Sequence, residues 1–120
     1  MKYADKIPYA FVLDHLTRVE FEVKPMFGCY AIYAGEKLCL FMVQRDKPII
    51  PGGRTEQNGI YVATTKQHIE ALKKDFQAAE FDMLKGDKAW MFFSEGSRDF
   101  ERYAVRACEL ISAIDMRIGR

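Results

Sequence analysis

The sequence predicts an α+β fold of two layers, with about five to six antiparallel strands in one sheet and three helices packed on it. Segments with apolar residues at every second position alternate along the chain with segments whose apolar residues recur at helical spacing. Short turns at Gly35-Glu36 and Gly86-Asp87 favour antiparallel hairpins. The expected order of elements is α-β-β-β-β-α-β-β-α, and 120 residues is the length of one domain.

Composition and charge are those of a globular protein. Hydrophobic residues make up 49% of the chain and charged residues 29%, which argues against disorder. Lys and Arg total 18 against 17 Asp and Glu, a net charge of +1, whereas proteins that bind nucleic-acid phosphates usually carry a basic excess. Nucleic acid is therefore not favoured as a partner, and an anionic partner would need a local patch of bases.

The short apolar runs and the spacing of the cysteines predict a cytoplasmic protein without a membrane partner. No apolar run approaches the ~20 residues of a membrane helix, and the beginning of the chain lacks the apolar segment of a signal peptide. The three cysteines, Cys29, Cys39 and Cys108, are odd in number and widely spaced, so they do not indicate a disulfide framework. We expect reduced thiols.

The first two elements are a helix and an exposed strand. Pro8 suits the first turn of a helix, which we expect from about Pro8 to Arg18 because apolar residues follow at helical spacing. From Val19 to Lys24, apolar residues alternate with charged ones, as in a strand with one solvated face. Pro25 cannot donate a ladder hydrogen bond, so strand pairing is expected to stop there.

The centre of the chain predicts a hairpin that is apolar on both faces. Cys29 to Ala34 and Leu38 to Val43 are the strands, and the Gly-Glu turn between them fits type II′. In that register Ile32 opposes Cys39. One face then carries Cys29, Ala31, Tyr33, Leu38, Leu40 and Met42, and the other carries Tyr30, Ile32, Cys39, Phe41 and Val43. We expect helices to cover one face, and either the following loop or a second subunit to cover the other.

The segment from Arg45 to Asn58 is predicted to be a long irregular loop, because it has two prolines, a Gly-Gly pair and no period. Arg45, Lys47 and Arg54, together with the glycine amides, could bind an anion. The alternative is a surface flap of mixed charge, since acidic residues lie among the bases.

A short strand, Ile60 to Ala63, follows the loop. Thr64 and Gln67 have the spacing of a capping box, which predicts that the second helix begins there.

A second hairpin and a long helix complete the prediction. The hairpin strands are Phe81 to Lys85 and Lys88 to Ser94, and Trp90 is either a core anchor or a platform on which a ligand stacks. Ser97 is the expected N-cap of a helix from about Arg98 to Ile114. Its apolar stripe is the clearest in the chain: Phe100, Tyr103, Ala104, Ala107, Leu110, Ile111 and Ile114.

One face of this last helix carries a ridge of arginines, Arg98, Arg102 and Arg106. The ridge could contact phosphates. The alternative is a solvated face, because Asp99 and Glu109 each lie three residues from an arginine and can form an ion pair with it.

No catalytic motif or metal-ligand spacing is present in the sequence. His15 and His68 are the only histidines, and neither has another ligand type at metal-binding spacing. No cofactor is predicted, and the cysteines have the sequence context of buried small residues rather than of activated thiols.

The central hairpin resembles the N-terminal domain of the TfoX/Sxy family. The residues that carry the resemblance are Met26-Phe27-Gly28, Tyr30-Ala31-Ile32-Tyr33, Gly35 and Lys37-Leu38, while Cys29 and Ala31 stand where the family pattern has glycine. The resemblance implies a two-layer fold like that of secretion chaperones, in a stand-alone domain without the C-terminal domain of the longer competence regulators. It supplies no catalytic residues. It implies that Met26, Phe27, Gly28, Tyr30 and Tyr33 determine the fold and can line an interface.

These observations predict a non-enzymatic, cytoplasmic regulatory or adaptor domain of a bacterial protein, which acts by protein contact and forms a homodimer. A small nucleic-acid-associated regulator that uses the arginine and lysine patches is one alternative. A domain that binds a small ligand under the 45–58 loop near Trp90 is another, and it would show itself as a change in tryptophan fluorescence.

Overall fold

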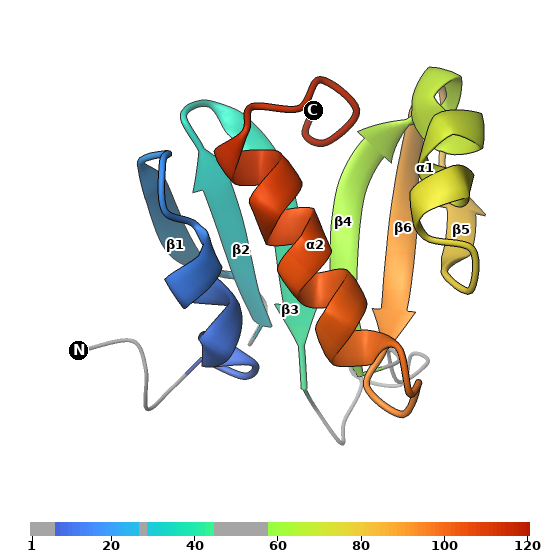
Figure 1. Ribbon diagram of the computed structural model, residues 1–120. Helices are drawn as coiled ribbons and strands as arrows, with labels where there is room; N and C mark the ends of the chain where they lie inside the picture. Colours follow the sequence, from blue (N-terminus) through green and yellow to red (C-terminus); the bar gives the residue numbers. More distant parts are fainter. Residues whose placement is uncertain (1–6, 27–28, 45–57) are drawn as a thin grey trace, which may run out of the picture.

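Six strands form one antiparallel sheet in the computed structural model, which describes residues 7–26, 29–44 and 58–120 (Figure 1). The strands lie in the order β1-β2-β3-β4-β6-β5, so β6 separates β4 from β5. Their bounds are β1 Phe21–Met26, β2 Cys29–Ala34, β3 Lys37–Val43, β4 Gly59–Thr65, β5 Glu80–Met83 and β6 Lys88–Ser94.

The helices lie on one face of this sheet, as Figure 1 shows. Two of them, η1 and η2, are 3-10 helices, and two, α1 and the longer α2, are α-helices; η2 leads directly into α1. Their bounds are η1 Ala10–His15, η2 Lys66–His68, α1 Ile69–Asp75 and α2 Phe100–Ser112. The predicted α+β class and the predicted order of elements are confirmed. None of the helices in the described ranges is long and apolar enough to cross a membrane.

The core lies between the sheet and α2. Ala104 and Ala107 of α2 are fully buried, because their small side chains let the helix backbone approach the strands. Beside them, Phe76, Phe93 and Tyr103 form an aromatic group with ring centroids 5.3 to 5.4 Å apart. Burial of this kind is worth roughly 1.5–3 kcal/mol for each large apolar side chain, so this layer holds the fold together.

The central hairpin has the predicted strands and a bulge that the sequence did not predict. Gly35 has φ +62°, as the first central residue of a type II′ turn requires. Ile32 opposes Leu40, and not Cys39 as predicted, because the register shifts by one residue at Cys39. Cys39 and Leu40 therefore both join the core beneath the helices.

The bulge changes which residues share a face. Leu40 and Met42 lie with Ile32 in the core, so their assignment to the opposite face was wrong. By strand alternation, the face without helices carries Cys29, Ala31, Tyr33, Leu38, Phe41 and Val43. Cys29 and Cys39 still lie on opposite faces, and all three cysteines are free thiols.

Near the N-terminus, two sequence expectations were wrong. The first helix is shorter than predicted and of 3-10 type, and Tyr9 before it has φ +59°. Pro25 lies inside β1, opposite Tyr30, because β1 is an edge strand and can direct a residue without an N–H group away from its partner.

Both predicted N-caps were also wrong. Thr64 belongs to β4 and its hydroxyl donates to the Arg117 carbonyl, so it caps no helix. The N-cap of α2 is Asp99, whose backbone N–H donates to the Ser97 hydroxyl at 3.2 Å.

The segment 118–120 is added to the sheet where β3 and β4 separate. The Leu38 N–H donates to the Arg120 carbonyl at 3.2 Å, and the Arg120 N–H donates to the Leu38 carbonyl at 3.1 Å. The Gly119 N–H donates to the Ala63 carbonyl at 2.7 Å on the other side. These bonds satisfy strand groups that would otherwise have no partner, and they fix Arg120 against the sheet.

Candidate functional site

The residues of the family-like motif do not form one surface. Met26 ends β1, whereas Tyr30 on β2 packs beside the core under the helices. Tyr33 points to the opposite face, where the Lys24 ammonium lies 4.7 Å from its ring centroid. Phe27 and Gly28 lie outside the described residues. The structure therefore places the described motif residues as parts of the sheet and not as a single binding site.

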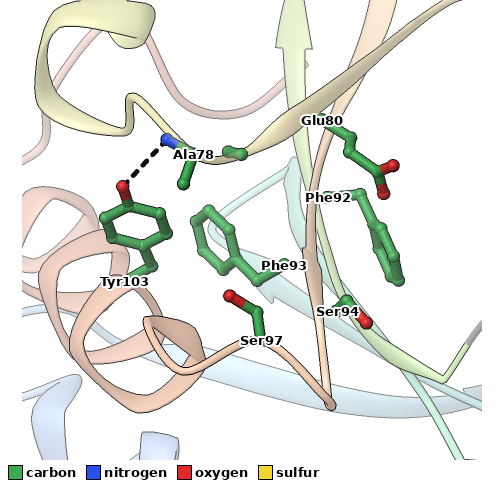
Figure 2. A pocket seen from close by; sticks show the side chains of 8 residues that line it. Ala78, Glu80, Phe92, Phe93, Ser94, Ser97 and Tyr103 are labelled. Atoms are coloured by element: carbon green, nitrogen blue, oxygen red, sulfur yellow. Dashed lines mark hydrogen bonds between the residues drawn. The ribbon is translucent and has the colours of Figure 1, made fainter.

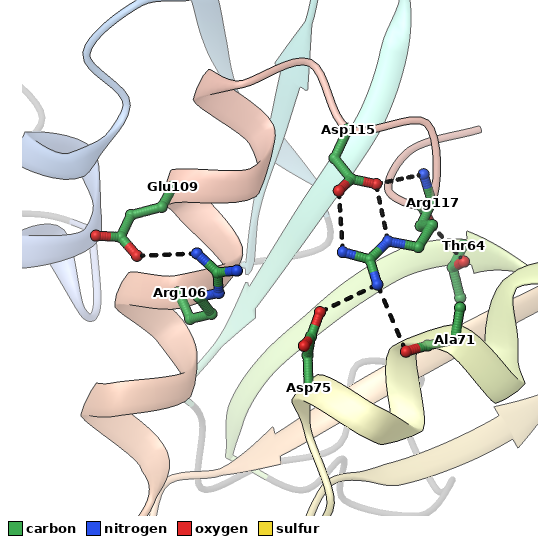
Figure 3. Close-up of polar contacts among 7 residues, drawn as sticks. All are labelled: Thr64, Ala71, Asp75, Arg106, Glu109, Asp115 and Arg117. Carbon is green, nitrogen blue, oxygen red and sulfur yellow. Dashed lines mark hydrogen bonds and ion pairs between the residues drawn. The ribbon is translucent and has the colours of Figure 1, made fainter.

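The arginine ridge on α2 is paired with carboxylates. Arg102 forms an ion pair with Asp99, and Arg106 lies 3.6 Å from Glu109, as the three-residue spacing indicated. Figure 3 shows the second of these pairs. Arg98 is exposed near the start of the helix. The predicted anion patch of Arg45, Lys47 and Arg54 lies outside the described residues.

A hollow of about 550 Å³ lies between α1 and α2, beside this ridge. Charged side chains of both signs line it, and the lining residues are Asp75, Glu101, Arg102, Tyr103, Val105, Arg106 and Glu109. Because the carboxylates outnumber the arginines and both arginines already have carboxylate partners, the hollow does not favour a phosphate over water.

A smaller cavity of about 260 Å³ lies beneath the loop between α1 and β5 (Figure 2). Its polar groups serve the backbone: the Tyr103 hydroxyl accepts a hydrogen bond from the Ala78 N–H at 3.0 Å, and the Ser94 hydroxyl accepts one from the Gly96 N–H at 3.4 Å. Phe93 forms an apolar wall. Glu80 also lines the cavity, and among the described residues no hydrogen bond or ion pair joins its carboxylate to the hydroxyl groups of Ser94, Ser97 or Tyr103.

The thiols and histidines form no reactive site in the described residues. Burial raises the pKa of the Cys108 thiol to about 12 and also raises the pKa of Cys39, so both stay protonated near neutral pH and are poor nucleophiles. No group of three or more potential metal ligands gathers in the part of the chain that the structure describes.

The loop after α2 is the surface feature that the protein's own packing does not explain. Helix α2 ends in a Schellman motif, in which the Ile114 N–H donates to the Ile111 carbonyl at 2.9 Å and the Asp115 N–H donates to the Leu110 carbonyl at 3.0 Å. Ile114 occupies the left-handed position of the motif, with φ +57°. Its side chain is 73% exposed, and that of Met116 is 72% exposed. We call residues 114–116 the tip.

Arg117 holds the tip in place (Figure 3). Its guanidinium donates to both carboxylate oxygens of Asp115, at 3.0 and 2.9 Å, and to the Asp75 carboxylate of α1 at 3.0 Å. Its carbonyl accepts the Thr64 hydroxyl hydrogen bond at 2.6 Å. Bidentate pairing of this kind is among the stronger polar contacts, so the tip is fixed to both α1 and β4.

The pKa shifts of Asp115 and Arg117 agree with these hydrogen bonds. Hydrogen bonds from Arg117 hold the pKa of Asp115 below its ordinary value, and hydrogen bonds to Asp115 raise the pKa of Arg117. The pair is therefore fully charged at neutral pH.

Sequence reasoning missed the tip. It placed Ile114 on the buried stripe of the last helix, whereas the helix ends at Ser112 and Ile114 lies in solvent. The available signal was the Asp-Met-Arg order of residues 115–117, in which a large apolar residue stands between two charges that can pair across it.

Comparison of the chain with protein-family models, with curated proteins and with solved structures finds no match.

Proposed function

We propose that this protein is a non-enzymatic regulatory or adaptor domain that acts by protein contact, and that the tip is its contact surface. The observation that carries the proposal is the pair of large apolar side chains, Ile114 and Met116, each more than 70% exposed on a rigidly held loop. Single exposed apolar residues are common on protein surfaces, but two on one fixed projection are typical of a binding site.

Backbone strain supports this reading of the tip. A left-handed conformation costs roughly 1–2 kcal/mol for a residue with a β-carbon, and a β-branched residue such as isoleucine is especially unfavourable there. Glycine is the usual residue at this position of a Schellman motif. Ile114 makes little packing contact within the chain that would offset this strain. A contact with another molecule therefore explains the isoleucine at this position better than a contribution to folding stability does.

The partner proposed is a second copy of the chain, in a symmetric dimer. In an isologous contact the same patch lies on both subunits, so two tips can bury their apolar side chains against each other. Edge strand β1 is less suited to pairing with a second sheet, because Glu22, Lys24 and Pro25 lie on it and such residues oppose edge-to-edge association.

The central hairpin, by contrast, does not require a second subunit. Helices cover one of its faces, and on the other face Ala31 and Val43 are fully buried within the chain. The dimer proposal therefore rests on the tip.

The resemblance to the TfoX/Sxy N-terminal domain supports a regulatory role and a cytoplasmic location, both of which belong to this proposal. The confirmed order of elements is compatible with a TfoX-like, secretion-chaperone-like fold. Nucleic-acid binding has less support, because the described α2 arginines nearest the hollow are paired with carboxylates.

Light scattering after size exclusion tests the proposal directly. The wild-type chain is expected to show a mass that rises with concentration toward twice 13.9 kDa. Met116→Asp places a charge on the tip and is expected to keep the protein monomeric. Met83→Asp is the matched control, because Met83 is also exposed but lies on β5. A wild-type protein that stays monomeric at millimolar concentration, or equal effects of both substitutions, would contradict the proposal.

A further inference from the structure

The face of the sheet without helices carries a row of aromatic rings. Phe41 on β3 and Tyr61 on β4 each lie near Trp90 on β6, with centroid distances of 6.3 and 5.8 Å. Tyr61 also packs against Phe92 at 4.4 Å. Phe41, Tyr61 and Trp90 are only half-buried, so the row presents part of its surface to solvent. Such a surface can stack a planar ring.

Arg120 lies over this row. Its backbone is paired with Leu38, and its guanidinium carbon is 4.6 Å from the centroid of the Trp90 ring. The stacking and the backbone pairing together fix the position of the cation, so little conformational freedom remains to be lost when a ligand binds.

The Arg120 guanidinium is not in direct contact with a carboxylate side chain of the described residues, although Asp87 lies near enough to attract it. Its Nε is buried and has no hydrogen-bond partner, and it forms no ion pair with a carboxylate of the described residues. By contrast, the guanidinium groups of Arg102, Arg106 and Arg117 all have carboxylate partners.

A second polar group without a partner lies at the same end of the sheet. The Thr65 hydroxyl is buried and makes no hydrogen bond. Thr65 is two residues beyond Ala63, which pairs with Trp90, so strand alternation places its side chain on the face of the aromatic row. The Arg120 Nε–H and the Thr65 hydroxyl, which both lack a hydrogen-bond partner, are donors that suit an anionic oxygen.

Electrostatics favours an anion at this position. Burial lowers the pKa of Arg120, and the opposing attraction comes from Asp87. Desolvation of a cation is unfavourable, and a carboxylate or phosphate oxygen in contact with the guanidinium would add to the attraction of Asp87 and offset that cost.

We propose that Arg120, Trp90 and Phe41 form a binding site for a small planar aromatic anion, whose ring packs on the aromatic row and whose carboxylate or phosphate is held by the Arg120 guanidinium. This site does not depend on the tip, since the two lie on different surfaces.

A nucleic-acid strand fits this face less well than a small anion does. Asp82 and Glu80 on β5 stand opposite Trp90 and Phe92 in the sheet, and by register they lie on the same face. A chain of phosphates that extended along the row would meet these carboxylates in succession, whereas a single anionic group would be held at the guanidinium of Arg120.

Trp90 makes the test direct, because it is the only tryptophan in the chain. Its fluorescence is measured during titration with adenosine monophosphate and with benzoate, which combine a ring with a phosphate or a carboxylate. Two control ligands each lack one of these groups: adenosine has the ring without the phosphate, and inorganic phosphate has the anion without the ring. At least one ring-bearing anion is expected to give a saturable change with half-saturation below about 1 mM, with each single-group probe about tenfold weaker.

Variants show whether Arg120 binds the anion. Arg120→Gln is expected to weaken the effective anion about tenfold or more, whereas Arg98→Gln, which removes an exposed arginine elsewhere, leaves it unchanged. If Arg120→Gln does not fold, Arg120→Lys replaces it and is expected to weaken binding several-fold, because it keeps the charge and loses the planar fork. Absence of saturation by both anions, or unchanged affinity in the folded Arg120 variant, would overturn the proposal. Neither outcome bears on the dimer, which light scattering measures separately.

Discussion

Tyr9 and Ile114 have the same unusual backbone conformation in very different surroundings. They are the two residues other than glycine with positive φ in the part of the chain that the structure describes, at +59° and +57°. Tyr9 packs edge-on against Phe100 at 5.0 Å, and its hydroxyl donates to the Val43 carbonyl at 3.1 Å. Ile114 is 73% exposed. The strain at Tyr9 is offset by contacts within the fold, whereas the strain at Ile114 is not.

This difference separates two parts of the molecule. Around Tyr9 and under α2, apolar burial and hydrogen bonds favour the folded state. From Ile114 to Arg120 the chain combines a strained residue, two exposed apolar side chains and an arginine whose buried Nε has no hydrogen-bond partner. Such local conflicts with stability are typical of functional segments.

The largest expected effect comes from Tyr9→Gly. Glycine relieves the strained backbone but removes the ring contact and the hydrogen bond, so we expect the free energy of unfolding to fall by about 2–3 kcal/mol. Tyr9→Phe, which removes the hydroxyl alone, is expected to cost about 1 kcal/mol. Urea denaturation measures both. An increase in stability in Tyr9→Gly would mean that the contacts at Tyr9 do not offset its strain.

Arg117→Ala is expected to have the next largest effect. It removes the charged hydrogen bonds to Asp115 and Asp75 that fix the tip, which should cost about 2 kcal/mol. The control is Arg106→Ala, which breaks an exposed pair with Glu109 and should cost less than about 0.5 kcal/mol. Equal losses in the two variants would contradict the assignment of Arg117 as the residue that holds the tip.

The pH dependence of the Arg117 effect is a separate prediction. Because Arg117 lowers the pKa of Asp115, the stabilisation is fully present above the ordinary carboxyl pKa of 3.8 and is lost as pH falls through the lower folded-state value. The difference in unfolding free energy between wild type and Arg117→Ala should therefore be constant from neutral pH to about pH 5 and should shrink below pH 3.8. A difference that stays constant in acid would exclude the Asp115 contact as its source.

The smallest expected effect has the opposite sign. Ile114→Gly removes the strain at a position that favours glycine, so stability should rise by about 0.5–1 kcal/mol. Ala113→Gly is the matched control: its φ is −84°, so glycine relieves no strain there and should slightly destabilise the protein. If Ile114→Gly destabilises the protein, the side chain contributes to the fold and the argument for an external contact fails.

The sequence predicted the fold class and the existence of both hairpins because turns and alternation are local signals. The predicted strand Phe81 to Lys85 and its two-residue turn at Gly86-Asp87 were wrong, because β5 ends at Met83 and Met83 pairs with Ala89 across a longer turn. The sequence could not predict the bulge at Cys39, since both faces of that strand are apolar and a shift of one residue leaves the pattern unchanged.

The ends of elements and the site were harder to predict. Ile114 continues the three-residue spacing from Ile111, and a Schellman motif that contains isoleucine instead of glycine gives no stop signal. The contact of Arg120 with Trp90 joins residues 30 positions apart and depends on how the 118–120 segment enters the sheet, which no local pattern specifies.

We propose that the tip contacts a second copy of the chain. Amide chemical shifts recorded while the protein is diluted test this claim residue by residue. Concentration-dependent shifts are expected to centre on residues 113–117 and to vanish in Met116→Asp. Shifts that centre on edge strand β1 instead, or spectra that do not change with concentration, would contradict it.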